Sequence, residues 1–301
     1  MDQVLTLVAP RRGDLTADIV AEAVAALNGL GAAAGAPTWL ADGEAADVPF
    51  SGVGADVATK AVNCVTDGRA LDLHAGPADG RRKRLLLADM DSTIVTSETL
   101  DDLAAHAGLK DKVAAITARA MNGELDFAAA VRERVGMLAG LPEAVLDETF
   151  AATTLTGGAV TLVRTMRANG ARCVLVSGGF KYFTQRVADA CGCHENHANG
   201  LIVADGRLTG EVAEPILDKH AKLATLERLT AELGLTPAQT LCVGDGANDL
   251  PMIAAAGLGV AFRGKPVVAA AAPARIEHAD LTALLFYQGY RRDDFVDATT
   301  A

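Results

Sequence analysis

The segment that decides the fold is Arg84-Leu85-Leu86-Leu87-Ala88-Asp89-Met90-Asp91-Ser92-Thr93, in which a short aliphatic run ends in two carboxylates. We interpret the run as a buried strand, because it is short and apolar and follows a basic cluster at 81–84. In an extended chain, residues i and i+2 lie on the same face. We therefore expect Asp89 and Asp91 side by side at the carboxyl end of the strand, the edge of an open α/β sheet where ligands bind.

Strands and helices alternate in the second half of the chain. The predicted strands lie at 172–176, 239–243 and 257–262, and the predicted helices at 159–168, 180–190, 218–233 and 250–257. Residues 200–212, with Asp205-Gly206 in the turn, predict a hairpin. Such alternation is typical of a doubly wound, mainly parallel α/β sheet. From about 97 to 155 the pattern is helical with no evident strand, which predicts a helical insert.

The N-terminal part has a different pattern. We predict strands at 2–8, 36–41 and 69–74 and helices at 15–29 and 54–66. With one further, optional strand before the second helix, the order β-α-β-(β)-α-β suits a small ferredoxin-like α+β module. Gly76-Pro77-Ala78-Asp79-Gly80 has the composition of a linker. We therefore expect one domain at 1–78 and a second at 79–301 that carries the insert.

Composition excludes several classes of protein. The net charge of -11 and the pI of about 5.0 argue against a dedicated nucleic-acid binder. No apolar stretch approaches the roughly 20 residues of a membrane helix, and the N-terminus does not resemble a secretory signal. The five cysteines are odd in number, and Cys173 and Cys242 fall in predicted core strands. We expect a reduced, cytoplasmic protein.

Polar clusters follow three of the predicted strands: Asp89 to Thr93, Ser177-Gly178-Gly179, and Gly244 to Asp249. Each alone could be a turn or a helix cap. Three clusters at corresponding positions would lie along one sheet edge and favour a functional site. Several carboxylates at one point require a hard cation, and oxygen ligands suit Mg²⁺.

The residue types suggest phosphoryl transfer. Ser177 and the backbone N–H groups that follow it would bind an anion such as phosphate, and Lys222 could add a fixed positive charge. Asp89 would be the nucleophile, since a carboxylate can carry a transient acyl-phosphate. Asp91 would protonate the leaving oxygen and later activate water, and neighbouring negative charge raises its pKa toward that role.

A Cys/His-rich segment, Cys191-Gly192-Cys193-His194-Glu195-Asn196-His197, contains residue types found in zinc sites. Its spacing is too tight for the usual four-ligand site, and no second pair follows. We interpret it as an exposed loop.

Four motifs resemble those of haloacid-dehalogenase-type phosphatases and, in their finer wording, those of phosphoserine phosphatases. They are Asp89-Met90-Asp91-Ser92-Thr93, Val176-Ser177-Gly178-Gly179-Phe180, Lys222 and Gly244-Asp245-Gly246-Ala247-Asn248-Asp249. The resemblance covers about residues 84 to 285. It implies an enzyme that hydrolyses O-phosphoserine through an aspartyl-phosphate, with Mg²⁺ as cofactor, in the last step of serine biosynthesis.

The resemblance also implies a role for each residue at the sheet edge. Asp89 would accept the phosphoryl group, and Asp91 would be the acid/base and offer its backbone carbonyl to Mg²⁺. Asp245 would complete the protein ligands together with the Asp89 carboxylate, and Asp249 would support the metal site. The phosphate would be bound by Ser177, Gly178 and Lys222, with Asn248 beside it.

Within the insert, which corresponds to the family's cap, the resemblance implies a substrate-reading set: Glu98, Met121, Phe127 and Arg134. Glu98 can pair with an ammonium group, and Arg134 can take a carboxylate bidentately. Without the resemblance, Arg134 would be interpreted as a solvated helix charge, Glu98 as a favourable charge at a helix start, and the two apolar residues as core.

Alternatives remain open from the sequence. The chain could transfer phosphate to another alcohol, hydrolyse a different small phosphomonoester, or bind amino acids as a non-catalytic regulator. The N-terminal module is similar in strand order to the ACT-like regulatory modules of related enzymes. It could sense serine or serve folding and dimerisation, so a homodimer is one expected form.

Overall fold

Five neighbouring parallel strands of one sheet belong to the part of the chain that carries Asp89. In a computed structural model of the protein, which describes residues 1–121, 124–217 and 219–297, their order is β12-β11-β6-β7-β8. The strands are β6 (Leu85–Ala88), β7 (Arg172–Phe180), β8 (Glu195–Asn199), β11 (Thr240–Gly244) and β12 (Leu258–Phe262). Every residue of β6, β11 and β12 is buried, as expected for central parallel strands that are covered on both faces. The predicted parallel α/β fold is confirmed.

Helices connect the strands of this sheet. They are α8 (Lys181–Cys191), α9 (Lys219–Glu232), α10 (Leu250–Ala255) and α11 (Pro266–Ala271). Leu87 and Val176 of the sheet pack in one apolar cluster with Leu226 of α9 and Ile253 of α10. This packing fixes the positions at which β6, β7 and β11 end, and therefore the positions of the polar clusters that follow them.

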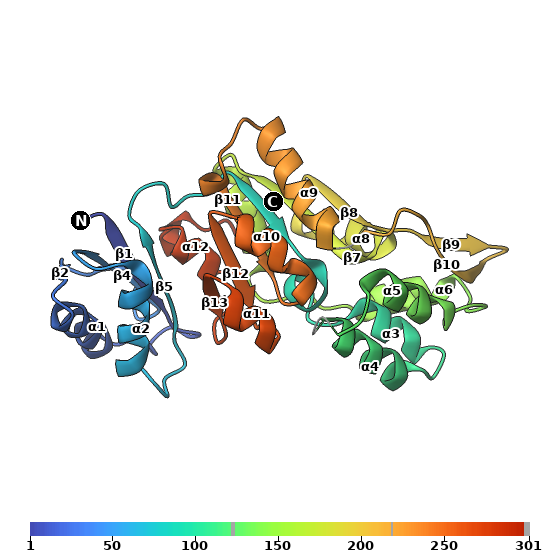
Figure 1. Ribbon diagram of the computed structural model, residues 1–301, viewed down its shortest axis with the longest axis horizontal. Coiled ribbons are helices and arrows are strands. Elements are labelled where there is room, and N and C mark those ends of the chain that lie inside the picture. Colours follow the sequence, from blue (N-terminus) through green and yellow to red (C-terminus); the bar gives the residue numbers. More distant parts are fainter. Residues whose placement is uncertain (122–123, 218, 298–301) are drawn as a thin grey trace. The chain divides into compact units, whose positions relative to one another are not determined.

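The predicted helical insert follows a π-helical turn, η1 (Met90–Ile94). It contains α3 (Thr99–Ala105), α4 (Lys110–Met121), α5 (Phe127–Gly136) and α6 (Ala144–Ala152). The predicted hairpin is also present, as β9 (Leu201–Ala204) and β10 (Arg207–Val212). It lies beside α5 (Figure 1), and its Leu208 exchanges backbone hydrogen bonds with the loop at Gly140 and Leu141. The hairpin therefore extends the insert.

The Cys/His-rich segment is not an exposed loop, and that interpretation was wrong. Cys191 is buried at the end of α8, and Glu195 begins strand β8, which pairs with β7. The His194 N–H donates to the Cys173 carbonyl at 2.8 Å, which starts the pairing. Strand propensity did not identify β8, because its sequence is mostly polar and has no β-branched residue.

The contacts divide the chain into two compact units. The unit just described comprises 85–156 and 171–273, and the other comprises 1–84, 157–170 and 274–297. Since both units combine segments that are distant in sequence, the predicted domain boundary at 78/79 stays a prediction.

The second unit contains an antiparallel sheet of order β2-β4-β1-β5, with β3 paired to β4. Its elements are β1 (Gln3–Val8), α1 (Ala17–Gly29), β2 (Ala33–Ala34), β3 (Thr38–Ala41), β4 (Ala45–Ser51), α2 (Ala55–Val65) and β5 (Asp72–Pro77). Leu5, Leu7 and Phe50 form its core with Leu27 of α1 and Val62 of α2. The predicted N-terminal α+β module is thus confirmed, with β4 as a strand that the sequence pattern did not define.

Distant segments complete this unit. They are α7 (Ala159–Ala168), β13 (Ala274–Ile276) and α12 (Ala283–Tyr287). The Arg81 guanidinium donates to Asp47 at 2.6 Å and to the backbone carbonyls of Phe286 and Tyr287. The buried Asp72 carboxylate accepts three backbone N–H groups, from residues 277 to 279. The N-terminal strands are therefore bonded to the chain some 200 residues later.

Two further findings concern the cysteines and the helices of the protein. The five cysteines, all of them in the described part of the chain, form no disulfide bonds. Across residues 1–121, 124–217 and 219–297, every helix is too short or too polar to cross a lipid bilayer.

His74 of β5 should make the stability of the protein sensitive to acid. Burial, reinforced by the positive charges of Arg81 and Lys83, lowers the pKa of His74 from 6.5 to about 4. The unfolded chain therefore binds a proton more readily than the folded chain between these two pH values, so stability is lost as the pH falls from 6.5 to 4. We expect His74→Leu to remove roughly 2–3 kcal/mol of that loss, measured by urea unfolding at pH 7.5 and pH 4.5. An identical pH dependence in the two proteins would contradict this assignment.

Candidate active site

A buried lysine connects two carboxylates at the carboxyl edge of the parallel sheet. Asp89 follows β6, and its Oδ1 lies 2.8 Å from Nζ of Lys222 in α9. The same Nζ lies 2.6 Å from Oδ1 of Asp249, which is fully buried after β11. Asp89 Oδ1 also accepts the Met90 N–H at 2.8 Å, whereas no described residue donates to Asp89 Oδ2. One oxygen of Asp89 is thus fixed and the other is left for a ligand.

Opposing effects set the protonation of this cluster. Burial alone would lower the pKa of Lys222, but the carboxylates of Asp249 and Asp89 outweigh burial and raise it. Burial, followed by the charge of Asp249, raises the pKa of Asp89 well above its usual value, although Lys222 opposes that shift. Lys222 therefore stays charged and partly compensates the two acids.

Asp245 is the least satisfied group in the site. It is 1% exposed, and neither of its carboxylate oxygens has a hydrogen-bond partner. Burial and the nearby Asp249 raise its pKa to about 7. Lys265 Nζ approaches its Oδ2 only to 3.7 Å. Such a carboxylate is unstable without a further positive charge.

These acids fit a metal site. Within the described residues, Asp89, Asp245 and Asp249 offer carboxylate oxygens that all lie within 4.8 Å of one another. Oxygen-only donors match a hard divalent cation, and the unpartnered oxygens of Asp245 are free to bind it. Asp249 is less available, because one of its oxygens holds Lys222 and the other accepts the Gly246 N–H.

Asp91 lies beside Asp89, although β6 ends at Ala88 and the chain then turns. Both acids keep extended backbone angles, so both remain on the same side. Ser92, at φ +52°, then reverses the chain. Asp91 Oδ1 accepts the Thr99 N–H at 2.8 Å, and its Oδ2 accepts Ser177 Oγ–H at 3.1 Å. Burial raises the pKa of Asp91, and these hydrogen bonds only partly oppose it.

The segment at the end of β7 requires glycine. Ser177 Oγ accepts the Gly179 N–H at 2.8 Å. A Cβ at Gly178 would lie 2.5 Å from the Phe127 ring, and a Cβ at Gly179 would lie 2.7 Å from Asp91 Oδ2. The two glycines therefore allow backbone, acid and cap residue to approach one point closely.

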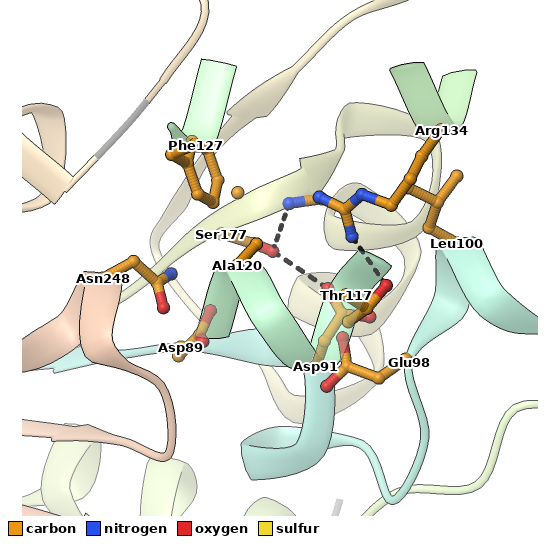
Figure 2. A pocket seen from close by; sticks show the side chains of 12 residues that line it. Asp89, Asp91, Glu98, Leu100, Thr117, Ala120, Phe127, Arg134, Ser177 and Asn248 are labelled. Carbon is orange, nitrogen blue, oxygen red and sulfur yellow. Dashed lines mark hydrogen bonds between the residues drawn. The ribbon is translucent and has the colours of Figure 1, made fainter. Parts of the chain in front are cut away.

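The insert supplies the opposite wall of this pocket. Ser92 Oγ donates to Glu98 Oε1 at 2.6 Å, and burial followed by the charge of Asp91 raises the pKa of Glu98 to about 8. Figure 2 shows Phe127 and Arg134 on the side of the pocket opposite Asp89 and Glu98. Arg134 is 7% exposed, so it is not the solvated helix charge that its sequence context alone would suggest.

One pocket brings most of the predicted residues together. It is lined by Asp89, Asp91, Glu98, Leu100, Thr117, Ala120, Phe127, Arg134, Ser177, Gly178, Gly179 and Asn248. Lys222, Asp245 and Asp249 do not belong to this lining, and Lys222 contacts it through Asp89. Met121 ends α4, and its side chain lies outside the described part of the chain.

Three lining residues escaped the sequence analysis. Thr117 precedes Met121 by four residues, so the two share a helix face, and the pattern could have indicated it. Leu100 and Ala120 are ordinary apolar residues of helices and carry no such signal.

Comparisons with known proteins agree with this geometry. Residues 86–254 match the model of the haloacid dehalogenase-like hydrolases. The chain is similar to the phosphoserine phosphatase of Streptococcus thermophilus (46% identity over 199 residues, 66% of this chain and 93% of that protein). It is also similar to the phosphoserine phosphatase of Streptomyces coelicolor (44% over 220 residues, 73% of this chain and 54% of that protein). The chain spans about half the length of several curated relatives that it matches.

A solved structure extends the similarity to the N-terminal module. A HAD family hydrolase from Salmonella enterica serovar Typhi superposes with a TM-score of 0.81 at 28% identity. The superposition covers 95% of this chain and 97% of that one. The fold, including the N-terminal antiparallel module, is therefore shared over nearly the whole chain.

Replacing Asp245 should stabilise the protein when no divalent cation is available. Because the folded-state pKa of Asp245 is raised to about 7, its ionisation weakens folding increasingly as the pH rises from 3.8 to 7. In a chelating buffer at pH 8 we expect Asp245→Asn to raise the free energy of unfolding by roughly 2–4 kcal/mol, and by less at pH 5. A divalent cation should then stabilise the wild type more than the variant. A variant less stable than the wild type in chelator at pH 8 would contradict the account, with thermal unfolding as the measurement.

Proposed function

We propose that this chain, which belongs to the haloacid dehalogenase-like hydrolase family, is a phosphoserine phosphatase that hydrolyses O-phospho-L-serine to L-serine and phosphate. The single observation that carries the proposal is the pocket itself, which is lined by Asp89, Glu98 and Arg134 together. A phosphorylated amino acid has a phosphate that Asp89 could attack, an ammonium group that Glu98 could bind and a carboxylate that Arg134 could bind. The similarity to curated phosphoserine phosphatases supports the same substrate, and with it the last step of serine synthesis.

The reaction would proceed in two displacements. Asp89 Oδ2 attacks phosphorus, and the bond from phosphorus to the serine oxygen breaks as Asp91 gives that oxygen a proton. Water then attacks the aspartyl-phosphate, Asp91 takes a proton from the water, and phosphate leaves with Asp89 regenerated. The raised pKa of Asp91 suits this exchange of a proton.

Phosphate binding would rest on the edge of the sheet. Ser177 and Gly178 line the same pocket as Asn248, and Lys222 adds its charge through Asp89. Asp89, Asp245 and the backbone carbonyl of Asp91 would hold Mg²⁺, which when bound supplies positive charge to the phosphoryl oxygens. Asp249 would support the site by fixing Lys222.

Substrate choice would rest on the insert. Arg134 would receive the substrate carboxylate and Glu98 the ammonium group, which would favour the ionised form of Glu98. Phe127, packed over Gly178, would bound the pocket above the phosphate, and we assign Met121 to the same role. The pocket would therefore select a small phosphorylated amino acid.

Wider assignments follow from the same proposal. Cysteines that form no disulfide bonds, two of them buried in the strands β7 and β11, fit a reducing compartment such as the cytoplasm. We retain homodimer formation and serine sensing as alternative roles of the ACT-like N-terminal module.

Asp89→Asn should abolish phosphate release from O-phospho-L-serine in the presence of Mg²⁺. An amide is too weak a nucleophile for phosphorus, so we expect a loss of at least about 10³-fold in kcat without unfolding. Asp102→Asn, in the exposed pair with Lys110, is the matched control and should retain activity. Near-normal turnover by the Asp89 variant would eliminate the covalent mechanism.

Arg134→Ala should reduce kcat/KM for O-phospho-L-serine by about 10²-fold or more, since a buried charge-assisted pair is lost. O-Phosphoethanolamine has no carboxylate, so kcat/KM for this substrate should fall much less. Arg132 lies in the same helix as Arg134, but it is exposed and pairs with Glu214. Arg132→Ala is therefore the control and should have little effect on kcat/KM. Equal losses for both substrates in the Arg134 variant would refute the assignment of the carboxylate site.

The same assays separate the alternatives. Adding homoserine or another alcohol acceptor would reveal phosphotransfer as a phosphorylated alcohol at the expense of free phosphate. A panel of small phosphomonoesters would reveal a different preferred substrate. Absence of any Mg²⁺-dependent phosphate release would favour the non-catalytic regulator.

A further inference from the structure

The Arg134 guanidinium is held in the pocket wall by uncharged groups. Its Nε donates to the Ala130 carbonyl at 3.1 Å, and its Nη1 donates to Thr117 Oγ1 at 2.9 Å. Among the described residues, none accepts from Nη2 and no carboxylate forms a direct ion pair with this guanidinium. An arginine that is 7% exposed and lacks an acidic partner is uncommon in a protein interior.

The acid that balances Arg134 lies one hydroxyl group away. Thr117 Oγ1 lies 2.6 Å from Asp101 Oδ1 and 3.1 Å from the Val113 carbonyl. The hydroxyl has one hydrogen, and the charged acceptor at the shorter distance is favoured. The result is a buried chain in which Arg134 donates to Thr117, and Thr117 donates to Asp101 (Figure 2 shows the first of these bonds).

This arrangement has a chemical consequence for the guanidinium. A carboxylate in direct contact with arginine takes two of its N–H groups at once. Because the hydroxyl of Thr117 separates the two charges, Asp101 orients the guanidinium without occupying that pair of donors. Asp101 itself does not line the pocket, whereas Thr117 and Arg134 do.

Stability alone does not account for the chain of groups. Asp101 is 8% exposed and Thr117 is 3% exposed, so both are removed from water. Buried charges are often no more stabilising than apolar residues of the same volume. A valine at 117 would fill the same space, and the hydroxyl therefore needs another reason.

We propose that Thr117 and Asp101 are positioning residues that hold Arg134 with its free N–H groups directed into the pocket, ready for the carboxylate of the substrate. The inference rests on the proposed function, since it assumes a substrate that carries a carboxylate. It assigns specificity to two residues that act through Arg134, and no chemical step to either.

The test compares Thr117→Val, which keeps the shape and removes the hydroxyl, with Thr117→Ser, which keeps the hydroxyl. The substrates are O-phospho-L-serine and O-phosphoethanolamine. We expect Thr117→Val to raise KM for phosphoserine about tenfold with a much smaller change in kcat, the effect of losing one hydrogen bond to a charged group. The preference for phosphoserine over phosphoethanolamine, as a ratio of kcat/KM, should fall by a similar factor, and Thr117→Ser should recover most of it.

Coupling to Arg134 distinguishes positioning from packing. In an Arg134→Ala background, Thr117→Val should no longer change the ratio of the two substrates, because the group that it positions is gone. A tenfold change that persists in that background would overturn the inference, as would an equal rise in KM for both substrates. Should Thr117→Val fold poorly, the double variant Asp101→Asn with Thr117→Val removes the buried charge left without a partner, and the same loss of preference is expected from it.

The two proposals can fail separately. If the wild type does not hydrolyse phosphoserine in preference to phosphoethanolamine, the proposed function fails and this inference with it. If the wild type shows the preference and Thr117→Val keeps it, the proposed function stands and the inference alone is overturned.

Discussion

A single buried ammonium group allows three carboxylates to share the end of one parallel sheet. The carboxylates belong to Asp89, Asp249 and Asp245. Nζ of Lys222 lies 2.8 Å from Asp89 and 2.6 Å from Asp249, and these three side chains are nearly inaccessible to water. Removing one charge from such a set would leave the others uncompensated in a medium of low dielectric. The set remains incomplete, because Asp245 has no hydrogen-bond partner for either oxygen. A divalent cation bound there would supply the positive charge that the described residues do not provide.

The walls around this cluster are built by different physical means. On the sheet side, backbone geometry controls the position of each group, through the turn at Ser92 and the glycines after Ser177. On the opposite wall, Phe127 and Arg134 of α5 line the pocket, and a hydrogen bond to Thr117 of α4 restrains the Arg134 guanidinium.

The positions of the polar residues at the carboxyl edge of the parallel sheet could be predicted from the sequence. The rule that strand residues i and i+2 share a face predicted the pairing of Asp89 and Asp91, and it succeeded because both residues stay extended after β6 ends. The positions of the other clusters followed from the ends of β7 and β11. These are local properties of a chain that alternates between buried strands and polar loops.

Other features depend on tertiary structure that the pattern does not encode. The spacing from Met121 indicates the face of α4 on which Thr117 lies, but whether its hydroxyl reaches Arg134 depends on how that helix packs against α5. Strand β8 was missed because pairing with β7, and not its own composition, makes it a strand. The burial of Arg134 likewise results from packing of the insert, since its immediate neighbours are charged.

The bonds that join the N-terminal strands to residues 277–287 constrain the order in which the protein can mature. During synthesis, Asp72 of β5 is made about 200 residues before the backbone N–H groups that donate to it. Arg81 likewise precedes the carbonyls of Phe286 and Tyr287, to which it donates, by about 200 residues. Contacts of such long range form late and slowly. The N-terminal sheet can therefore reach its final hydrogen bonding only after the ribosome has produced all the parallel strands from β6 to β12. A nascent chain interrupted earlier would leave the Asp72 carboxylate and the Arg81 guanidinium without these partners.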